Sequence, residues 1–343
     1  MKAQRFLPSC LSVLTTSLML AACGGGGGGG SGGMVIEPPA SNGPLTITSN
    51  NYQNVAVQAV SSGSYLMDAG AGNVLGADAQ ALPQPLQLAR AEALRLATRF
   101  ALSGGAVVLG ATTTVVQPCN QGGSIEVTVN DANNNQNLDA GDSMSLKAQS
   151  CRESGVTMDG SMEYAVKAAT GNYGSSQFSA TLGVKLNGLR VTSAAGSQTG
   201  QGEFQMTVAV TGTSSAALTM SIPSFVTSST VAGTTVQSTL TGYSLSVSTV
   251  PSGFGYRSTL TFGGKLSSTA LEAKEITVST PVALVQESSR AYPGSGQVLV
   301  KGGNGSQVRI TAQSDGKALV ELDANGDNVF ETSTVKNWAD LRG

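Results

Sequence analysis

An alternation of apolar and polar residues covers most of the chain after Gly105. Alternation with a period of two residues predicts strands that have one buried face and one exposed face. Gly, Asn, Asp and Ser separate the alternating segments, as turn residues do. The predicted inward-facing residues are Ile125, Val127 and Val129; Met144, Leu146 and Ala148; Met162, Tyr164 and Val166; Leu182, Val184 and Leu186; Phe204, Met206, Val208 and Val210; Leu218, Met220 and Ile222; Leu245 and Val247; Leu260 and Phe262; Ile276 and Val278; Val298 and Val300; and Val308 and Ile310. Together these segments predict roughly a dozen strands.

This pattern also indicates how the strands are connected. One buried face and one exposed face suit antiparallel pairing, because parallel sheets are usually covered on both faces. Short polar turns separate the strands, so strands that are neighbours in the sequence are expected to pair. We therefore predict a mainly β protein, built as a large antiparallel meander that forms a barrel, a half-barrel or a sandwich.

One segment, at about residues 85–102, follows a helical period. Its apolar residues recur at spacings of three and four, and two glycines follow it. We expect one amphipathic helix here, packed on the sheet; a helix that lies on a lipid surface is the alternative. Upstream of it, the stretches VAVQAV (55–60) and SYLM (64–67) alternate and predict one or two short strands.

The N-terminus has the charge and hydropathy pattern of a secretory signal. Lys2 and Arg5 precede an apolar run from Phe6 to Leu20, which is the order typical of such signals. The run has about 15 residues, fewer than the ~20 that a membrane-spanning helix needs. We therefore assign residues 1–22 to a signal peptide.

The signal ends in Leu20-Ala21-Ala22-Cys23, which resembles the lipobox of bacterial lipoproteins. The resemblance implies that the Cys23 thiol receives a diacylglycerol and that the bond before it is cut. The new amino group would then carry a fatty acid such as palmitate, and several acyl chains give stable anchoring in a bilayer. Gly24 takes the place of the aspartate that marks inner-membrane retention, so we expect the outer membrane of the cell envelope. A cleaved signal followed by an unmodified cysteine is the alternative.

Residues 24–33 are glycine except for Ser31. Glycine-rich chains behave as random coils, and ten such residues span roughly 16–19 Å. We assign residues 23–45 to the lipidated cysteine and its tether, and residues 46–343 to a β-rich domain.

Composition narrows the possible functions. Only 12% of the 343 residues are charged and the formal net charge is -2, so we expect no nucleic acid partner. Histidine is absent, which removes the commonest general base and a common zinc ligand. The sequence contains no phosphate-binding or dinucleotide-binding motif. We therefore do not expect an enzyme, although chemistry by a pair of carboxylates stays open.

Two cysteines remain after the signal is removed and Cys23 is lipidated. They are Cys119 and Cys151, an even pair in an oxidising compartment, which predicts a disulfide. Two buried free thiols are the alternative. The bond would close a loop of about 30 residues and stabilise the fold by roughly 3–4 kcal/mol.

The segment DANNNQNLDAGD, residues 131–142, resembles the twelve-residue calcium loops of EF-hand and dockerin proteins. Its candidate ligands are Asp131, Asn133, Asn135, Asn137 through its backbone carbonyl, Asp139 and Asp142. Gln136 replaces the usual glycine, and aspartate replaces the bidentate glutamate of EF-hands. The closeness of this loop to the cysteine pair in the sequence suggests that the loop and the disulfide brace the same region.

A shorter version of this pattern lies near the C-terminus. Its candidate ligands are Asp323, Asn325, Asp327 and Glu331, at positions one, three, five and nine of a similar loop. Calcium is therefore the one cofactor that the sequence suggests. Turns without metal are the alternative for both loops, because Asn, Asp and Gly are also the usual turn residues.

The region from Cys119 through the Asp-rich loop to GVTMDGSMEY, together with DANGDNVFE and the WADL that follows, resembles a family of uncharacterised proteobacterial outer-membrane lipoproteins. The resemblance implies that this chain is related to those proteins, but it implies no activity, because the family has none assigned. The function we expect is a calcium-braced structural or surface-interaction β domain, with the bilayer as a partner through Cys23. A carrier that holds a lipid or another apolar ligand in a curved sheet is the alternative, and the sequence does not identify a protein, glycan or lipid partner.

Overall fold

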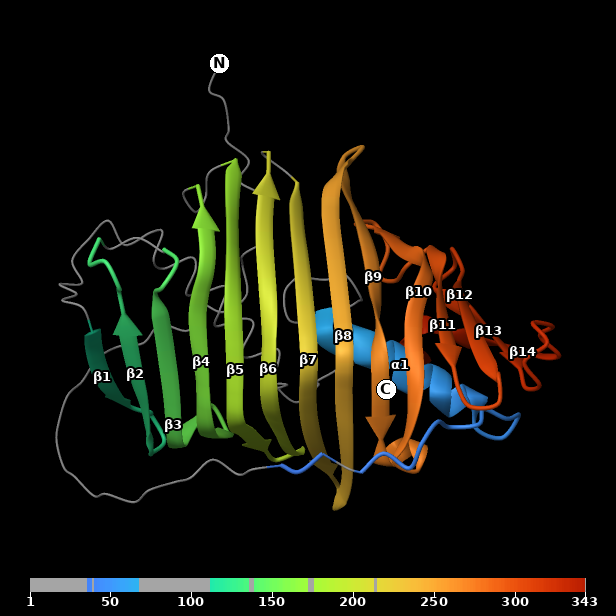
Figure 1. Cartoon of the computed structure of the whole chain (residues 1–343), viewed down its shortest axis with the longest axis horizontal. Helices are drawn as coiled ribbons and strands as arrows, with labels where there is room; N and C mark the ends of the chain where they lie inside the picture. The colour runs from blue at the N-terminus through green and yellow to red at the C-terminus, as the bar shows by residue number, and fades with distance from the viewer. Residues whose placement is uncertain are drawn as a thin grey trace.

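The computed structural model describes residues 36–38, 40–67, 112–135, 139–171, 176–212 and 215–342. In these ranges 14 strands form one sheet in which every strand pairs antiparallel with its neighbours in the sequence (Figure 1). The antiparallel meander that the alternation predicted is confirmed. Strands β1 and β14 lie at opposite ends, so the sheet is open and is not closed into a barrel.

The structure defines one α-helix, fourteen strands and two short 3-10 helices among the described residues. They are α1 (Tyr52–Met67), β1 (Thr112–Pro118), β2 (Ser124–Asn130), β3 (Ser143–Glu153), β4 (Val156–Thr170), β5 (Gln177–Ser193), β6 (Gly196–Thr211), β7 (Ala216–Val231), β8 (Thr234–Ser252), β9 (Gly255–Ser268), η1 (Thr269–Leu271), β10 (Lys274–Glu287), β11 (Ser295–Lys301), β12 (Gln307–Ala312), β13 (Lys317–Asp323), β14 (Thr332–Asn337) and η2 (Trp338–Leu341).

The core lies on one face of this sheet. All the inward-facing residues that the alternation predicted lie in strands, and most of them are buried. The exceptions are half-buried and lie on β2 and β6: Ile125, Val127, Val129, Val208 and Val210. Three strands were not among the predicted segments. Of these, β13 alternates as clearly as the others, with Ala318, Val320 and Leu322 buried, whereas β1 and β14 are mostly polar.

Helix α1 corrects the prediction for the region before the sheet. The short strands expected at 55–60 and 64–67 are wrong, because both stretches lie within this helix. The six residues VAVQAV alternate, but the longer window from Tyr52 to Val60 has its apolar residues at helical spacing. Tyr52, Val55, Ala56, Ala59 and Val60 are all buried, so the period of 3.6 residues prevails over the shorter alternation.

Local hydrogen bonds start the helix. The Asn51 side chain accepts a bond from the Thr48 backbone N–H at 2.8 Å, and the Thr48 carbonyl accepts from the Tyr52 N–H at 3.0 Å. This arrangement satisfies backbone groups that a helix N-terminus otherwise leaves unpaired.

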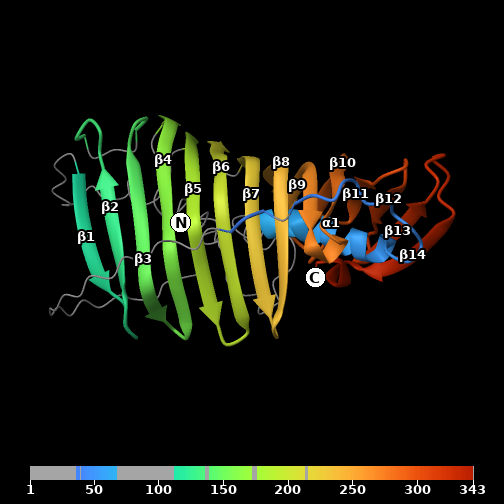
Figure 2. The ribbon, with the colours of Figure 1, turned by 60° about the horizontal axis from the view of Figure 1, so that its bottom comes forward.

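The helix packs on the C-terminal part of the sheet, mainly on β9 and β11 to β13, and on η2 (Figure 2). Gly63 allows a close approach, because a Cβ atom there would lie 2.6 Å from Cζ of Phe262. The hydroxyl groups of Ser62 and Tyr243 form a buried hydrogen bond of 2.8 Å. Burial is the main reason why the pKa of Tyr243 lies above its usual value. Beyond the helix, the buried side chains of Trp338 and Leu341 close the C-terminal end.

The segment before α1 also lies on the sheet. Pro44 and Thr46 form parallel bridges with Glu275 and Gly303, and the Ile47 N–H donates to Oγ of Ser306 at 2.8 Å. Further upstream, the Ile36 N–H donates to the Gln201 side chain at 2.7 Å. Contacts with the sheet therefore begin within the range 23–45, which the sequence assigned to the tether.

Other predictions fall outside the described residues. They are the signal peptide, the lipidated Cys23, the glycine tether and the helix at 85–102. Within the described ranges, no helix has both the length and the apolar character needed to cross a membrane.

Candidate metal loops and a polar hollow

The predicted disulfide is confirmed. Cys119 follows β1 and Cys151 lies on β3, and their sulfur atoms are bonded at 2.03 Å with a Cα to Cα distance of 5.4 Å. The bond connects the β1–β2 turn to the third strand. Beside it, the Glu153 carboxylate accepts hydrogen bonds from the backbone and side-chain nitrogens of Asn120, both at 2.8 Å.

The disulfide and the first Asp/Asn loop do not adjoin. The loop connects β2 to β3 beyond Asn130, whereas the disulfide lies beyond Ser124, at the other end of β2. The seven residues of β2 separate them by roughly 20 Å at ~3.3 Å per residue. The expectation that both brace one region is therefore wrong, because an extended strand carries residues that are close in sequence far apart.

Asp142 organises the first loop. Its Oδ1 accepts from the Ala132 N–H at 2.9 Å, and its Oδ2 accepts from the Asp139 N–H at 2.7 Å. The side chains of Asp131 and Asp142 are both about 1% exposed. The Asn135 N–H donates to Oδ1 of Asp131 at 3.3 Å. The carboxylates at the two ends of the loop are thus held mainly by backbone donors.

Asp139 lies on the exposed side of this loop. The side-chain nitrogen of Asn133 donates to its Oδ2 at 2.9 Å, and that of Asn135 donates to the same oxygen. These two bonds lower the pKa of Asp139, because they favour its charged form. The amide nitrogens, and not the amide oxygens, face the carboxylate. A cation would require these amides to rotate, since calcium takes oxygen ligands. Asn137 lies outside the described residues.

The second loop joins β13 to β14 and gathers its carboxylates more closely. Ligand oxygens of Asp323, Asp327 and Glu331 all lie within 4.8 Å of one another. Among the described residues, the carboxylates of the first loop form no such group. Three predicted ligands therefore come together here, and Asn325 stays beside them through a bond from its side-chain nitrogen to Oδ2 of Asp327 at 3.1 Å.

Asp323 is the centre of this loop and is completely buried. Its Oδ1 accepts from the Gly326 N–H at 2.7 Å, and its Oδ2 accepts from the Asn328 N–H at 2.8 Å. Burial raises the pKa of Asp323, but the hydrogen bonds outweigh it, so the pKa lies below its usual value. The carboxylate is therefore charged at neutral pH, and it holds the loop through the backbone N–H groups of Gly326 and Asn328.

Two residues that the sequence analysis missed support this loop from neighbouring parts of the sheet. The Gln307 side chain, on β12, donates to Oδ2 of Asp323 at 2.8 Å and to Oδ1 of Asn328 at 3.0 Å. Gly305, in the turn between β11 and β12, contacts the backbone of Gly326, where a Cβ would lie 2.9 Å from the Gly305 Cα. Neither residue carries a metal-ligand signal, because each reaches the loop only through the pairing of strands.

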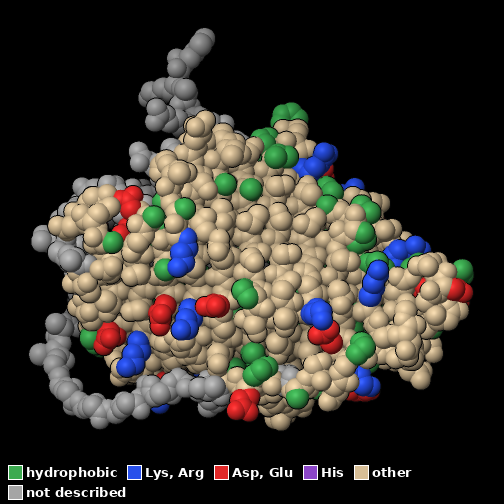
Figure 3. Space-filling view, viewed as in Figure 1, with side chains coloured by type: hydrophobic (Ala, Val, Ile, Leu, Met, Phe, Trp, Pro, Cys, Tyr) green, Lys and Arg blue, Asp and Glu red, His purple; other side chains and the backbone are tan. Residues whose placement is uncertain are grey.

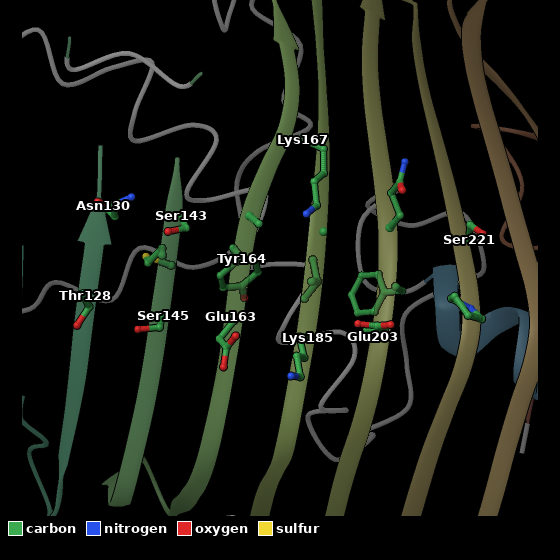
Figure 4. A pocket seen from close by; sticks show the side chains of 17 residues that line it. Thr128, Asn130, Ser143, Ser145, Glu163, Tyr164, Lys167, Lys185, Glu203 and Ser221 are labelled. Carbon is green, nitrogen blue, oxygen red and sulfur yellow. The ribbon is translucent and has the colours of Figure 1, made fainter. Parts of the chain in front are cut away.

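A hollow of about 640 Å³ lies on the exposed face of the sheet, over strands β2 to β7. Glu163, Lys185 and Glu203 form a row across it, because the register pairs Glu163 with Lys185 and Lys185 with Glu203. Lys167 lies above this row, with Thr128, Ser143 and Ser145 on one side of it and Ser221 on the other (Figure 4). Figure 3 shows Lys, Asp and Glu side chains gathered on this face over the same strands. In the sequence these residues occupy the polar positions between the inward-facing ones, and only the register of the strands shows that they lie side by side.

In comparisons with models of known protein families, with curated proteins and with solved structures, the chain matches none. The chemistry of the site therefore rests on the geometry above.

Proposed function

We propose that this protein is a bacterial outer-membrane lipoprotein, anchored through acylated Cys23, whose β domain is a calcium-braced structural or surface-interaction module. The loop around Asp323 is the observation that carries the proposal. Three carboxylates meet there, and one of them belongs to a buried, charged aspartate, Asp323. Oxygen ligands of this kind are what calcium takes. The lipobox resemblance supports the anchor, and the polar hollow supports a role in surface contact.

A calcium ion at this loop would brace the last strands of the sheet. It would neutralise charge on Asp327 and Glu331, which lie close together at the surface. Asp323 already connects β13 to Gln307 on β12, so an ion bound beside it would fix the β13–β14 loop against β12 and the β11–β12 turn. Hydrogen bonds from Gly326 and Asn328 keep the Asp323 carboxylate in place before any ion arrives.

Thermal unfolding with and without calcium tests the brace. A ligand that binds only the folded state stabilises it by about 2.7 kcal/mol at a hundredfold excess over Kd. We expect millimolar calcium, added after chelator, to raise Tm by roughly 2 °C or more. Magnesium should act less well, because it needs a tighter octahedral site. An equal Tm in chelator and in calcium, with no calcium uptake in calorimetry, would overturn the proposal.

Single variants assign the calcium effect to a loop. Asp323→Ala should remove most of the calcium-dependent rise in Tm, and Asp131→Ala should remove a smaller part, if any. Asp315→Ala is the matched control, since Asp315 is an exposed aspartate of the β12–β13 turn that pairs with Lys317 at 3.2 Å. The control should keep the full calcium response. If the calcium-dependent rise in Tm survives in Asp323→Ala, the ion binds elsewhere in the protein and not at this loop.

Acyl labelling tests the anchor separately. We expect Cys23→Ala to remove fatty-acid labelling and to shift the protein from the detergent phase to the aqueous phase. Cys10→Ala, a change within the predicted signal peptide, should leave both unchanged. Unchanged labelling of the Cys23 variant would overturn the lipoprotein proposal and would not affect the calcium proposal.

The carrier alternative has less support. The hollow beside α1, lined by Ser62, Gln198 and Leu240 among others, measures about 180 Å³. Pockets for drug-sized ligands usually measure ~300–1,000 Å³. The larger hollow has the charged side chains of Glu163, Lys185 and Glu203 in a row across it, and an apolar ligand that covered them would remove them from water at a cost. Lipid that stays bound to purified protein through repeated washing would reverse this preference.

A further inference from the structure

Among the described residues, no strand pairs with the outer edges of β1 and β14, and these two edges differ in their chemistry. β14, with the sequence TSTVKN, carries Lys336, and a charged residue on an edge strand opposes pairing with another chain. β1, with the sequence TTTVVQP, carries no charge. Its Val115 and Val116 point to opposite faces and are 56% and 60% exposed. An uncharged edge with exposed valines is a template for strand addition.

The hairpin fixes which backbone groups of β1 face outward. The Cys119 N–H donates to the Gly123 carbonyl at 3.1 Å, and the register pairs Val115 with Val127. Hydrogen-bonded pairs recur at every second residue of an antiparallel ladder, so the odd-numbered residues of β1 bond to β2. The N–H and carbonyl groups of Thr112, Thr114 and Val116 therefore point away from the sheet. Pro118 offers only its carbonyl there.

We propose that a second copy of this chain pairs with that edge, β1 against β1 in antiparallel orientation, around a twofold axis at Val115. In this register Thr114 of each copy faces Val116 of the other, and both exchange backbone hydrogen bonds. Thr112 donates to the carbonyl of Pro118, which has no N–H to give back to the Thr112 carbonyl. The outward groups of the strand thus pair with those of its copy, except for the Thr112 carbonyl, which lies at the end of the paired segment and stays open to water.

The side chains fit the same register. Val115 lies on the inner face beside Val127, so the twofold axis brings two Val115 side chains together and continues the apolar stripe across the junction. No charge in β1 repels its copy. A single strand pair buries less area than a stable interface of standard size. The association is therefore concentration-dependent, and a shared membrane surface would strengthen it by raising the local concentration.

Cysteine crosslinking tests the register on the full chain in detergent. The proposed twofold makes Val115 a non-hydrogen-bonded pair, with Cα atoms ~4.5 Å apart, within disulfide range. Val115→Cys should therefore give a disulfide-linked dimer on mild oxidation. Val116→Cys is the matched control, since its two copies would lie roughly 8 Å apart along and across the strands, beyond that range. Wild type, oxidised in parallel, sets the background.

A second pair of variants tests the edge itself. Thr114→Pro removes an outward N–H without taking one from the β1–β2 ladder, and should abolish the dimer in sedimentation. Thr114→Val keeps the N–H and loses only the hydroxyl bond to Thr128, and should keep the dimer. Val115→Cys that crosslinks no more than Val116→Cys or wild type would overturn the proposal. Sedimentation as a monomer at all concentrations would also overturn it, as would binding of another protein to β1 in place of the copy.

Discussion

At Asp323 one carboxylate joins two strands and a loop through three hydrogen bonds. Because these bonds hold its pKa below the usual value, the charged form is favoured in the folded state. A depressed pKa contributes stability that is present above the ordinary carboxyl pKa, and that is lost as the pH falls through the folded value. The stability of the domain should therefore have an acid limb that depends on this residue.

The test is urea unfolding of wild type and Asp323→Asn from pH 7 to pH 3 in chelator. We expect the variant to be less stable at neutral pH, because asparagine offers one acceptor oxygen and no charge. The difference in free energy of unfolding should shrink as the pH falls below ~4, because there the unfolded wild-type chain takes up a proton at Asp323 before the folded chain does. A difference that stays constant over the whole range would contradict this assignment.

Gly326 is a second residue on which the loop depends. Its φ of 83° lies in the left-handed region, and a Cβ would meet the backbone of Gly305 at 2.9 Å. Gly253 has a similar φ of 58° with no atom near its Cβ position. Gly326→Ala should therefore be about 1–3 kcal/mol less stable than Gly253→Ala, because only the first adds overpacking to the backbone strain. If both variants lose the same free energy of unfolding in chemical denaturation, the backbone at Gly305 shifts to accommodate the added Cβ at little cost.

Among the elements, the close contact between α1 and β9 gives the next prediction. Alanine normally stabilises a helix interior by roughly 0.5–1 kcal/mol relative to glycine. At Gly63 the added Cβ would lie 2.6 Å from the Phe262 ring. We expect Gly63→Ala to lower the free energy of unfolding by about 1–3 kcal/mol. Combining it with Phe262→Leu should recover part of that loss in a double-mutant cycle, and additive losses would contradict the contact.

The elements also show what the sequence could predict. Strands such as β3 to β5 could be predicted, because their apolar and polar residues alternate over a long stretch and one face of each strand is exposed to solvent. Helix α1 was misread because a six-residue alternation was given more weight than the helical spacing over the nine residues from Tyr52 to Val60. The carboxylate cluster of the second loop could be predicted from the spacing of Asp323, Asp327 and Glu331, which the structure brings together. The support from Gln307 and the row through Lys185 could not be predicted, because both depend on strand register across the sheet.

For the whole molecule, the disulfide restrains the unfolded chain and secures the N-terminal edge of the sheet. Cys119 and Cys151 are 32 residues apart in the sequence, and a loop of that length is worth roughly 3–4 kcal/mol. The Cys119→Ala, Cys151→Ala double variant should lose about that much stability in urea unfolding. Its hydrogen exchange should speed up first in β1 and β2, which lie beyond the bond. Two free thiols from these positions in unreduced wild type would contradict the premise.

The packing of α1 affects when different parts of the chain can fold during synthesis. Ile47 and Ser62 bond to residues that follow them by 259 and 181 positions, whereas each strand after the first pairs with a strand that precedes it directly in the chain. Since synthesis runs from the N-terminus, every new strand finds its partner already present. The helix is complete first and its binding surface is complete last. Its apolar residues, such as Val55 and Ala59, therefore stay unburied until nearly the whole sheet has been synthesised. A chaperone would be of most use to the chain during this interval.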